Sequence, residues 1–500
     1  MQDLLGAGAL LPCICFEVSV FFVGCCGISS RGKWNGTAGT VMKEKHIFAD
    51  LKFRLQRRFV RKIKKPLYKK REENCLADGP RAVHITYYKA LNMGDTVLSA
   101  CVRRTLSQLC GMSFPHLVSV DEPVTDALIE TINQADLLVI GGGGLFLPDT
   151  NKNSVSGWQW AIPPDQLKKI RVPIVVYTVG YNYFRGQSRS TLFEENLRLL
   201  LAKSSFIGLR NLGSCRAVTE ILQQNASVCA GFGAQAGGES GLEMQVYQEA
   251  NGTDCGADGW TKGGPAAPEH DRDFTGGSAL LQVPEIVFQP CTTTLIRKLY
   301  PELPGAEKTG RIGLNLAFDR SELRFGEEKE RILSQIAQAM KEIENRGYTI
   351  VYIAHCIEDF QFLPWLDAAG VRCEKAETSD WFPEKALSFY NRIDLVLGMR
   401  GHAQMIPFGL NKEIITLGTH DKMRWFLEDI DAEDWYIELR ENPDQLKETI
   451  VRTFIRVHET ESDRTRERLL AAQEQLWEIT RQNAEKISAI CSRASAAKKR

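Results

Sequence analysis

Arg400 and His402 are separated by one glycine and directly follow Ile393–Gly398, an apolar run typical of a buried strand. An arginine guanidinium can bind a carboxylate or a phosphate through two parallel hydrogen bonds. An imidazole can accept and donate a proton near neutral pH. At the end of a strand and the start of a helix, this pair predicts a site for a small anion. The alternative is a surface arginine beside a hydrogen-bonded core histidine.

Two glycine-containing segments follow expected strands in the earlier part of the chain. Asn92-Met93-Gly94-Asp95 lies between a strand and a helix, and we expect Asp95 to be the helix N-cap of an anion or hydroxyl site. Gly141–Gly144 allow a ligand to approach the backbone closely, with Gly142 and Gly143 at the centre. Their spacing matches neither a Walker loop nor a dinucleotide fingerprint. The alternatives are an ordinary capped turn and a flexible connection.

Polar residues also follow two later strands. Val179–Asn182, with Arg185 just beyond, form a polar and aromatic loop that suits the face of a sugar. Arg210 follows the strand that ends at Leu209, where a charged side chain commonly faces a ligand.

The later part of the chain adds further candidates. His420 and Lys422 follow an expected strand, and His355 ends another. Cys291 has no basic neighbour in sequence, so we interpret it as a packed thiol rather than a nucleophile. The chain has no HExxH motif and no CxxC pair, so we expect no metal site.

Composition limits the class of protein. The chain has 500 residues, 43% of them hydrophobic, which is enough for two or more domains with large cores. The 62 basic and 62 acidic side chains cancel, so net charge gives no reason to expect nucleic acid as a partner. The 14 cysteines are scattered and are typical of reduced thiols.

Residues 1–80 form an apolar and then basic leader. Leu4–Ser29 is mostly apolar but contains Glu17, and no basic residue precedes it, which disfavours a signal peptide. One interpretation is a single or peripheral membrane contact that leaves the bulk of the protein in the cytoplasm, at the cytoplasmic face of the membrane. The other is a disordered basic leader of a cytoplasmic protein, with synthesis starting at Met42. Both interpretations stay open.

The rest of the chain divides by pattern. Apolar runs alternate with amphipathic stretches over 81–224 and again over 285–458, which predicts two doubly wound α/β domains that face each other across a cleft. Residues 225–284 form a glycine-rich insertion or linker, and 459–500 form a charged helix with a basic tail. We expect this helix to pack across the domains or to form a homo-oligomer. The expected strands are Ala82–Tyr87, Leu137–Ile140, Pro173–Val179, Ser205–Leu209, Arg311–Ala317, Tyr348–Ala354, Ile393–Leu397 and Glu413–Leu417.

Four motifs together resemble the polysaccharide pyruvyl transferase family. They are NMGD at 92–95, GGGG at 141–144, GLRN at 208–211 and GMRGH at 398–402. Lys422 lies where that family has a lysine, and the resemblance extends over residues 81–458. It implies a fold similar to two-domain GT-B glycosyltransferases. It also implies transfer of the pyruvyl group of phosphoenolpyruvate onto two sugar hydroxyls of a cell-surface polysaccharide or its precursor, with a cyclic ketal and phosphate as products.

The resemblance also implies roles for individual residues. Arg210 and Arg400 would bind the two anionic groups of the donor with help from Lys422, and His402 would be the general acid and base. No cofactor besides the donor is expected, and the partners are phosphoenolpyruvate and a glycan acceptor. The remaining expected contacts to substrate come from Asn92, Gly94, Asp95, Gly142, Gly143 and Asn182.

Two other functions remain open. One is a GT-B glycosyltransferase that uses a nucleotide sugar, with the glycine segment on the diphosphate. The other is a non-catalytic module that binds an anionic sugar. The residue types do not reveal the acceptor sugar.

Overall fold

The computed structural model describes residues 79–88, 92–148, 153–184, 187–224, 283–305 and 307–498. The membrane predictions for the leader and most of the 225–284 insertion therefore lie outside the described residues, as does Arg185. Within the described ranges, no helix combines the length and the apolar character needed to cross a membrane.

The first half of the described chain is built on a six-stranded parallel sheet in the order β2-β1-β3-β4-β5-β6. Its strands are β1 (Arg81–Thr86), β2 (Ser113–Ser119), β3 (Leu137–Phe146), β4 (Ile174–Tyr181), β5 (Ser204–Leu209) and β6 (Ile286–Phe288). Its helices are α4 (Met93–Cys110), α5 (Asp126–Gln134), α6 (Pro164–Lys168), α7 (Thr191–Lys203) and α8 (Leu212–Gln224). The central strands are buried on both faces, as an almost continuous apolar sequence requires.

The second half repeats this architecture with the order β12-β11-β10-β7-β8-β9, again all parallel. Its strands are β7 (Arg311–Asn315), β8 (Thr349–Ala354), β9 (Cys373–Glu377), β10 (Leu395–Gly398), β11 (Glu413–Gly418) and β12 (Tyr436–Glu438). Its α-helices are α10 (Ile296–Leu299), α11 (Ser321–Phe325), α12 (Lys329–Asn345), α13 (Leu363–Ala368), α14 (Pro383–Tyr390), α15 (His402–Gly409), α16 (Asp421–Glu428) and α17 (Leu446–Phe454). Short 3₁₀ segments are η2 (Thr292–Leu295), η3 (Gly326–Glu328), η4 (Ile357–Phe362), η5 (Glu433–Trp435) and η6 (Pro443–Gln445), and η7 (Ile455–Thr460) is a π-helix.

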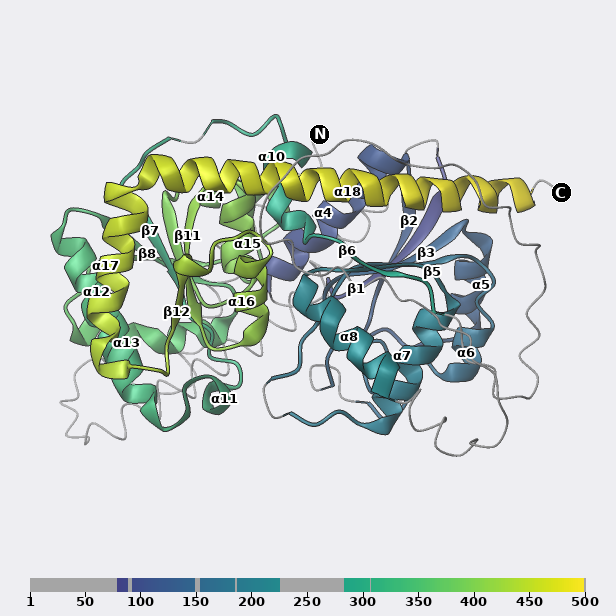
Figure 1. Ribbon diagram of the computed structural model, residues 1–500, viewed down its shortest axis with the longest axis horizontal. Coiled ribbons are helices and arrows are strands. Elements are labelled where there is room, and N and C mark those ends of the chain that lie inside the picture. Colours follow the sequence, from purple (N-terminus) through teal and green to yellow (C-terminus); the bar gives the residue numbers. More distant parts are fainter. Residues whose placement is uncertain are drawn as a thin grey trace, which may run out of the picture. The chain divides into compact units, whose positions relative to one another are not determined.

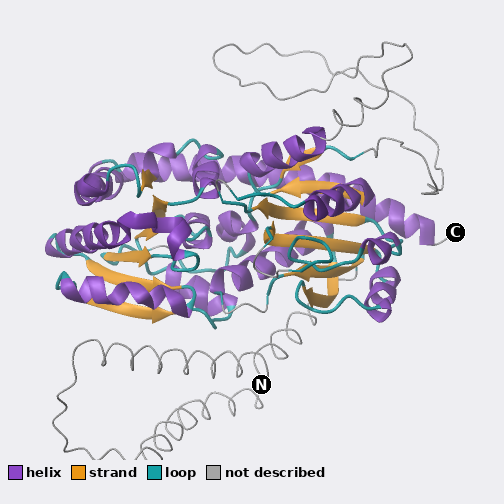
Figure 2. Ribbon diagram, turned by 90° about the horizontal axis from the view of Figure 1, so that it is seen from below, coloured by secondary structure: helices purple, strands orange, loops and turns teal. Residues whose placement is uncertain are grey.

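These two sheets confirm the predicted fold class of two doubly wound α/β sheets (Figures 1 and 2). β6 pairs with β5 of the first sheet, so the second alternating region begins after Phe288 rather than at residue 285. Four strands lack an apolar run long enough to predict them. These are β2, β6, β9 and β12.

The last helix, α18 (Ser462–Lys498), contacts both halves. Asn483 Nδ2 donates to the carbonyl of Phe288 in β6 (2.8 Å), and Cys110 at the end of α4 donates to the carbonyl of Ala484 (3.4 Å). Gln473 donates to the carbonyl of Phe408 in α15. Figure 1 shows α18, in yellow, passing beside elements of both sheets. Of the two expectations for this segment, the structure shows packing across the halves.

Two local predictions near the candidate site were wrong. Gly141–Gly144 are part of β3, which continues to Phe146, and are not a loop after it. The N-cap of α4 is Asn92, whose Oδ1 accepts from the Gly94 amide (3.1 Å), while Asp95 lies in the first helical turn. Asn92 has the extended backbone and the short acceptor side chain that an N-cap requires.

Candidate active site

The predicted motifs gather at the point in each sheet where the strand order reverses. In the first sheet this is the β1/β3 pair, which leads into Asn92–Asp95 and contains Gly142 and Gly143. In the second sheet it is the β7/β10 pair, which leads into Asp319 and Arg400–His402. Doubly wound sheets bind ligands beside the carboxyl ends of the strands at such points. The structure brings both of these points to one place.

His402, the first residue of α15, lies against the first turn of α4 from the other half. A Cβ on Gly94 would lie 2.5 Å from His402 Cβ and 2.6 Å from Nδ1. Asp95 Oδ1 is 3.8 Å from Nδ1, and Cys291 Sγ is 4.0 Å from Nε2. The absence of a side chain at Gly94 is therefore what allows the imidazole to take this position.

Arg210 and Asn182 form a second polar pair, supplied by β5 and β4. Arg210 Nη2 donates to Asn182 Oδ1 at 2.6 Å. A Cβ on Gly180 would lie 2.2 Å from Arg210 Nε, and a Cβ on Gly144 would lie 1.5 Å from Asn182 Nδ2. Glycines on β3 and β4 thus leave the space that these two side chains fill.

The two central glycines of β3 have a conformational role. Gly142 and Gly143 have φ values of +81° and +110°, which L side chains rarely adopt. A Cβ on Gly143 would lie 4.0 Å from Asp95 Oδ1. These glycines turn the backbone of β3 beside the start of α4.

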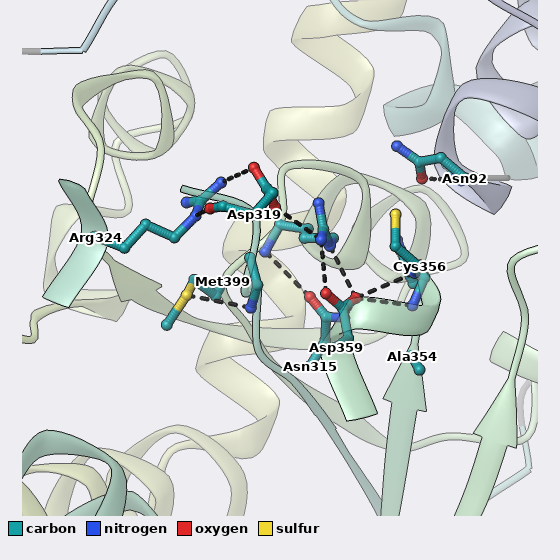
Figure 3. Close-up of polar contacts among 12 residues, drawn as sticks. Asn92, Asn315, Asp319, Arg324, Ala354, Cys356, Asp359 and Met399 are labelled. Atoms are coloured by element: carbon teal, nitrogen blue, oxygen red, sulfur yellow. Dashed lines mark hydrogen bonds and ion pairs between the residues drawn. The ribbon is translucent and has the colours of Figure 1, made fainter. Parts of the chain in front are cut away.

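The Arg400 guanidinium forms ion pairs with two carboxylates. The residues next to Arg400 in the sequence did not predict these partners. Its Nε and Nη2 donate to Asp359 Oδ2 (2.9 Å) and Oδ1 (2.6 Å), and Nη2 also lies 2.8 Å from Asp319 Oδ1. Asp319 is bound from its other side by Arg324 at 2.9 Å. Figure 3 shows Asp319, Arg324, Asp359 and the Asn315 amide that accepts from the backbone of residue 400. Among the described residues, the third guanidinium nitrogen of Arg400, Nη1, has no partner.

Arg210 and Lys422 have the opposite surroundings. In the described part of the chain, no carboxylate lies within 4.0 Å of either charged group, whereas Arg324 and Arg400 are both ion-paired. Phe184 of the first half lies under the guanidinium groups of Arg320 (5.3 Å) and Arg324 (5.7 Å). Positive charge therefore exceeds negative charge around this point.

Burial, together with this excess of positive charge, shifts the pKa values of nearby groups. Burial, and then Arg210 and Lys422, lower the pKa of His402 to about 3. Burial, and then Arg210 and Arg324, lower the pKa of Lys422 well below its ordinary value. Burial raises the pKa of Asp95 to about 6, even though Arg210, Arg400 and Lys422 oppose this shift. At neutral pH His402 is a neutral base, and an anion among these groups would raise the pKa values of His402 and Lys422.

Three other predicted candidates take structural positions. The His355 ring is buried and contacts the hydroxyl of Tyr390 at 2.6 Å through Nε2. The His420 side chain caps α16 by accepting from the Lys422 amide (3.2 Å), and its ring packs on Phe184. Burial raises the pKa of the Cys291 thiol, so Cys291 is protonated although it lies beside His402.

Residues 40–230 match the polysaccharide pyruvyl transferase family. The match confirms the resemblance for three of the four motifs, NMGD, GGGG and GLRN. It includes the first-half site residues from Asn92 to Arg210, while Arg400, His402 and Lys422 lie beyond it.

Solved structures that resemble this chain include the following three proteins. A glycosyltransferase from Rickettsia africae has a TM-score of 0.43 at 8% identity, over 83% of this chain and 99% of that one. An O-GlcNAc transferase from Thermobaculum terrenum has a TM-score of 0.41 at 11% identity, over 84% and 69%. A UDP-GlcNAc 2-epimerase from Neisseria meningitidis has a TM-score of 0.39 at 10% identity, over 80% and 99%. A search of curated protein sequences gave no significant match.

Proposed function

We propose that this protein transfers the pyruvyl group of phosphoenolpyruvate onto two hydroxyls of a sugar in a cell-surface polysaccharide or its precursor, forming a ketal and releasing phosphate. The observation that supports this most directly is the pair Arg210 and Lys422, which lack a described carboxylate partner and which, with burial as the larger cause, lower the pKa of the nearby His402. Such a site favours a small, highly charged anion next to a proton-accepting group.

The donor has a carboxylate and a phosphate on a three-carbon body, so it needs several cations close together. Arg210 offers Nε, which is buried and has no hydrogen-bond partner among the described residues, and Lys422 offers a nearby ammonium. Arg400 would bind the donor through Nη1, because Asp359 and Asp319 occupy its other two nitrogens. Because Asp359 and Asp319 already balance its charge, Arg400 would mainly orient the donor and would neutralise little of the donor's negative charge.

The acceptor would lie on the side of Asn182. Its Oδ1 is occupied by Arg210, which leaves the Nδ2 donor for a sugar hydroxyl. Asn92 uses both ends of its amide, on Gly94 and Asp95, and is better explained as a capping residue than as a sugar ligand.

The proposed reaction has two steps. The first hydroxyl oxygen bonds to C2 of the donor while the electrons of the double bond form a C3–H bond, so that the hydroxyl proton, passed by His402, becomes part of the new methyl group. The C2–O bond to phosphate then breaks and phosphate leaves with the electron pair. The second hydroxyl oxygen bonds to C2, and its proton passes through His402 to the phosphate.

The protonation of His402 fits both steps. A neutral imidazole is ready to accept the first hydroxyl proton. The negative charges of the bound donor would offset Arg210 and Lys422, raise the pKa of His402 and allow it to hold that proton until it is donated.

The decisive experiment incubates the full chain with phosphoenolpyruvate and a panel of glycans and measures phosphate release and product mass. We expect phosphate release that depends on both substrates and a product that carries a pyruvyl ketal. Thermal stabilisation by UDP-sugars but not by phosphoenolpyruvate would instead favour the nucleotide-sugar glycosyltransferase. Stabilisation by an anionic sugar, with no turnover of either donor, would favour a non-catalytic binding module.

A further inference from the structure

The carboxyl group of Asp95 faces the imidazole of His402 across the junction of the two halves. Asp95 Oδ1 lies 3.8 Å from His402 Nδ1, and their side chains are 21% and 10% exposed. The distance is longer than an ordinary N–H···O hydrogen bond, and catalytic hydrogen bonds are often long in unliganded structures. The two groups are therefore close enough to pair after a small adjustment.

Asp95 is held in this orientation by Asn92. Asn92 Nδ2 donates to Asp95 Oδ2 at 2.9 Å, while Asn92 Oδ1 accepts from the Gly94 amide. One amide side chain thus caps α4 and occupies one carboxylate oxygen, which leaves Oδ1 for His402. Gly94 lies beside the same Nδ1 edge of the ring, and it has no Cβ to displace the imidazole.

The second ring nitrogen has a different neighbour. His402 Nε2 lies 4.0 Å from the thiol sulfur of Cys291, and burial keeps that thiol protonated by raising its pKa. A thiol is a weak donor and does not compete for a proton on Nε2. The surroundings of the ring therefore favour a proton on Nδ1, beside the carboxylate, and a lone pair on Nε2.

We infer that Asp95 is a positioning residue for His402. Its carboxylate accepts the Nδ1–H of the imidazole and fixes the tautomer in which Nε2 takes the acceptor proton. The base comes from the second half and its orienting carboxylate from the first, so the proton-transfer unit exists only where the halves meet. This inference rests on the proposed function for its chemical purpose, but the tautomer can be measured without turnover.

Other charged groups also face His402. Arg210 after β5 and Lys422 of α16 disfavour the imidazolium, and so does burial. His355 after β8 is also near, and its own pKa is lowered by burial, Arg400 and His402. The Asp95 carboxylate lies 3.8 Å from Nδ1 of the ring. A substitution of Asp95 should therefore alter the protonation of the His402 imidazole.

The test compares Asp95→Asn with wild type. Asn92 would still donate to the oxygen of the new amide, which turns the amide nitrogen toward His402 Nδ1. A donor at that position forces the ring proton onto Nε2, so we expect the tautomer to reverse. Asp126→Asn is the matched control, because Asp126 is also an acidic residue in the first turn of a helix but is a surface residue paired with Lys169.

The measurement is nitrogen NMR of the full chain with labelled histidine, in which His402 is assigned by its loss in His402→Gln. We expect Nδ1–H in wild type and in Asp126→Asn, and Nε2–H in Asp95→Asn. In turnover assays Asp95→Asn should lower kcat by about 10²- to 10⁴-fold with little change in the donor KM. Asp95→Glu should recover part of kcat, and Asp95→Ser serves for the same measurement where Asp95→Asn does not fold.

An unchanged His402 tautomer in Asp95→Asn, even with activity lost, would overturn the positioning role. So would a wild-type ring that already has its proton on Nε2. Failure of the proposed function has a different signature, in which the tautomer reverses as expected but wild-type protein makes no ketal from phosphoenolpyruvate.

Discussion

Arg210 in the first half and Arg400 in the second follow strands of similar sheets, yet their surroundings are opposite. Arg400 is bound by two carboxylates, one of them the fully buried Asp359. Arg210 is bound by a neutral amide and has no described carboxylate partner. Two arginines that follow strands in similar motifs can therefore differ in whether their charge is neutralised by neighbouring carboxylates. Two nitrogens of the Arg400 guanidinium are bound by carboxylates, and in the proposed function the Arg210 charge is available to the donor.

The largest expected effect comes from breaking the Arg400 network. Asp359→Ala leaves a buried guanidinium with its main partner removed and also removes the acceptor for the amides of His355 and Cys356. We expect a loss of about 3–5 kcal/mol in the free energy of unfolding, measured by urea denaturation.

The control for this prediction is Glu374→Ala, because Glu374 pairs with Arg311 on the surface. That variant should change stability by about 1 kcal/mol or less. Equal effects of the two substitutions would mean that Arg400 is no more firmly fixed than a surface arginine.

Arg210→Gln should show the reverse pattern. It removes a buried cation that has no described carboxylate within 4.0 Å, so the melting temperature should stay unchanged or rise. Loss of a charged hydrogen bond of about 1.5–3 kcal/mol predicts a donor KM about 10- to 100-fold higher, measured by steady-state phosphate release. A variant that loses stability but keeps its donor KM would contradict the contrast with Arg400.

Gly94→Ala probes the junction without altering any charge. The new Cβ would collide with His402, so we expect a lower kcat, measured by phosphate release with both substrates saturating. Helix propensity favours alanine by about 1 kcal/mol, which should offset part of the strain in thermal melts. Gly305→Ala is the control, because no atom lies within 4 Å of a Cβ built there. Wild-type kcat in Gly94→Ala would show that the ring position is not critical.

The smallest effect is in proton linkage. The pKa of His402 is about 3 in the free site, and a bound anion raises it, so donor binding should take up protons. Binding is then tighter below the raised pKa and weakens as pH rises through it. Calorimetry in two buffers of different ionisation enthalpy measures the uptake, which should be smaller in His402→Gln. Identical uptake in the variant would assign the protons to another group.

The sequence predicted the two α/β halves because their central strands are uninterrupted apolar runs between amphipathic helices. It did not predict β9, whose sequence Cys373–Glu377 is mostly polar, since an edge strand is held by backbone pairing more than by burial. Four glycines in a row are typical of a loop, and only neighbouring strands can hold them in β3.

For the candidate site, the sequence predicted the residues that follow strands but not the partners that hold them. Strand-end motifs identified Arg210, Arg400, His402 and Lys422, and the structure brings them together. The partners of Arg400 lie after other strands and helices, so no local pattern links them to it. Asp319, Asp359 and Phe184 were missed for this reason, because tertiary contacts alone bring them to the site.

The position of α18 has a consequence for the order of folding during synthesis. Its partners include β6 and α4 of the first half and α15 of the second, so none of its contacts can form until residues beyond 462 have left the ribosome. Each sheet is complete before that point, and can fold while translation continues. Helix α18 then joins two units that are already formed. Ribosome-bound chains stalled before residue 462 should therefore contain both folded sheets without this final docking step.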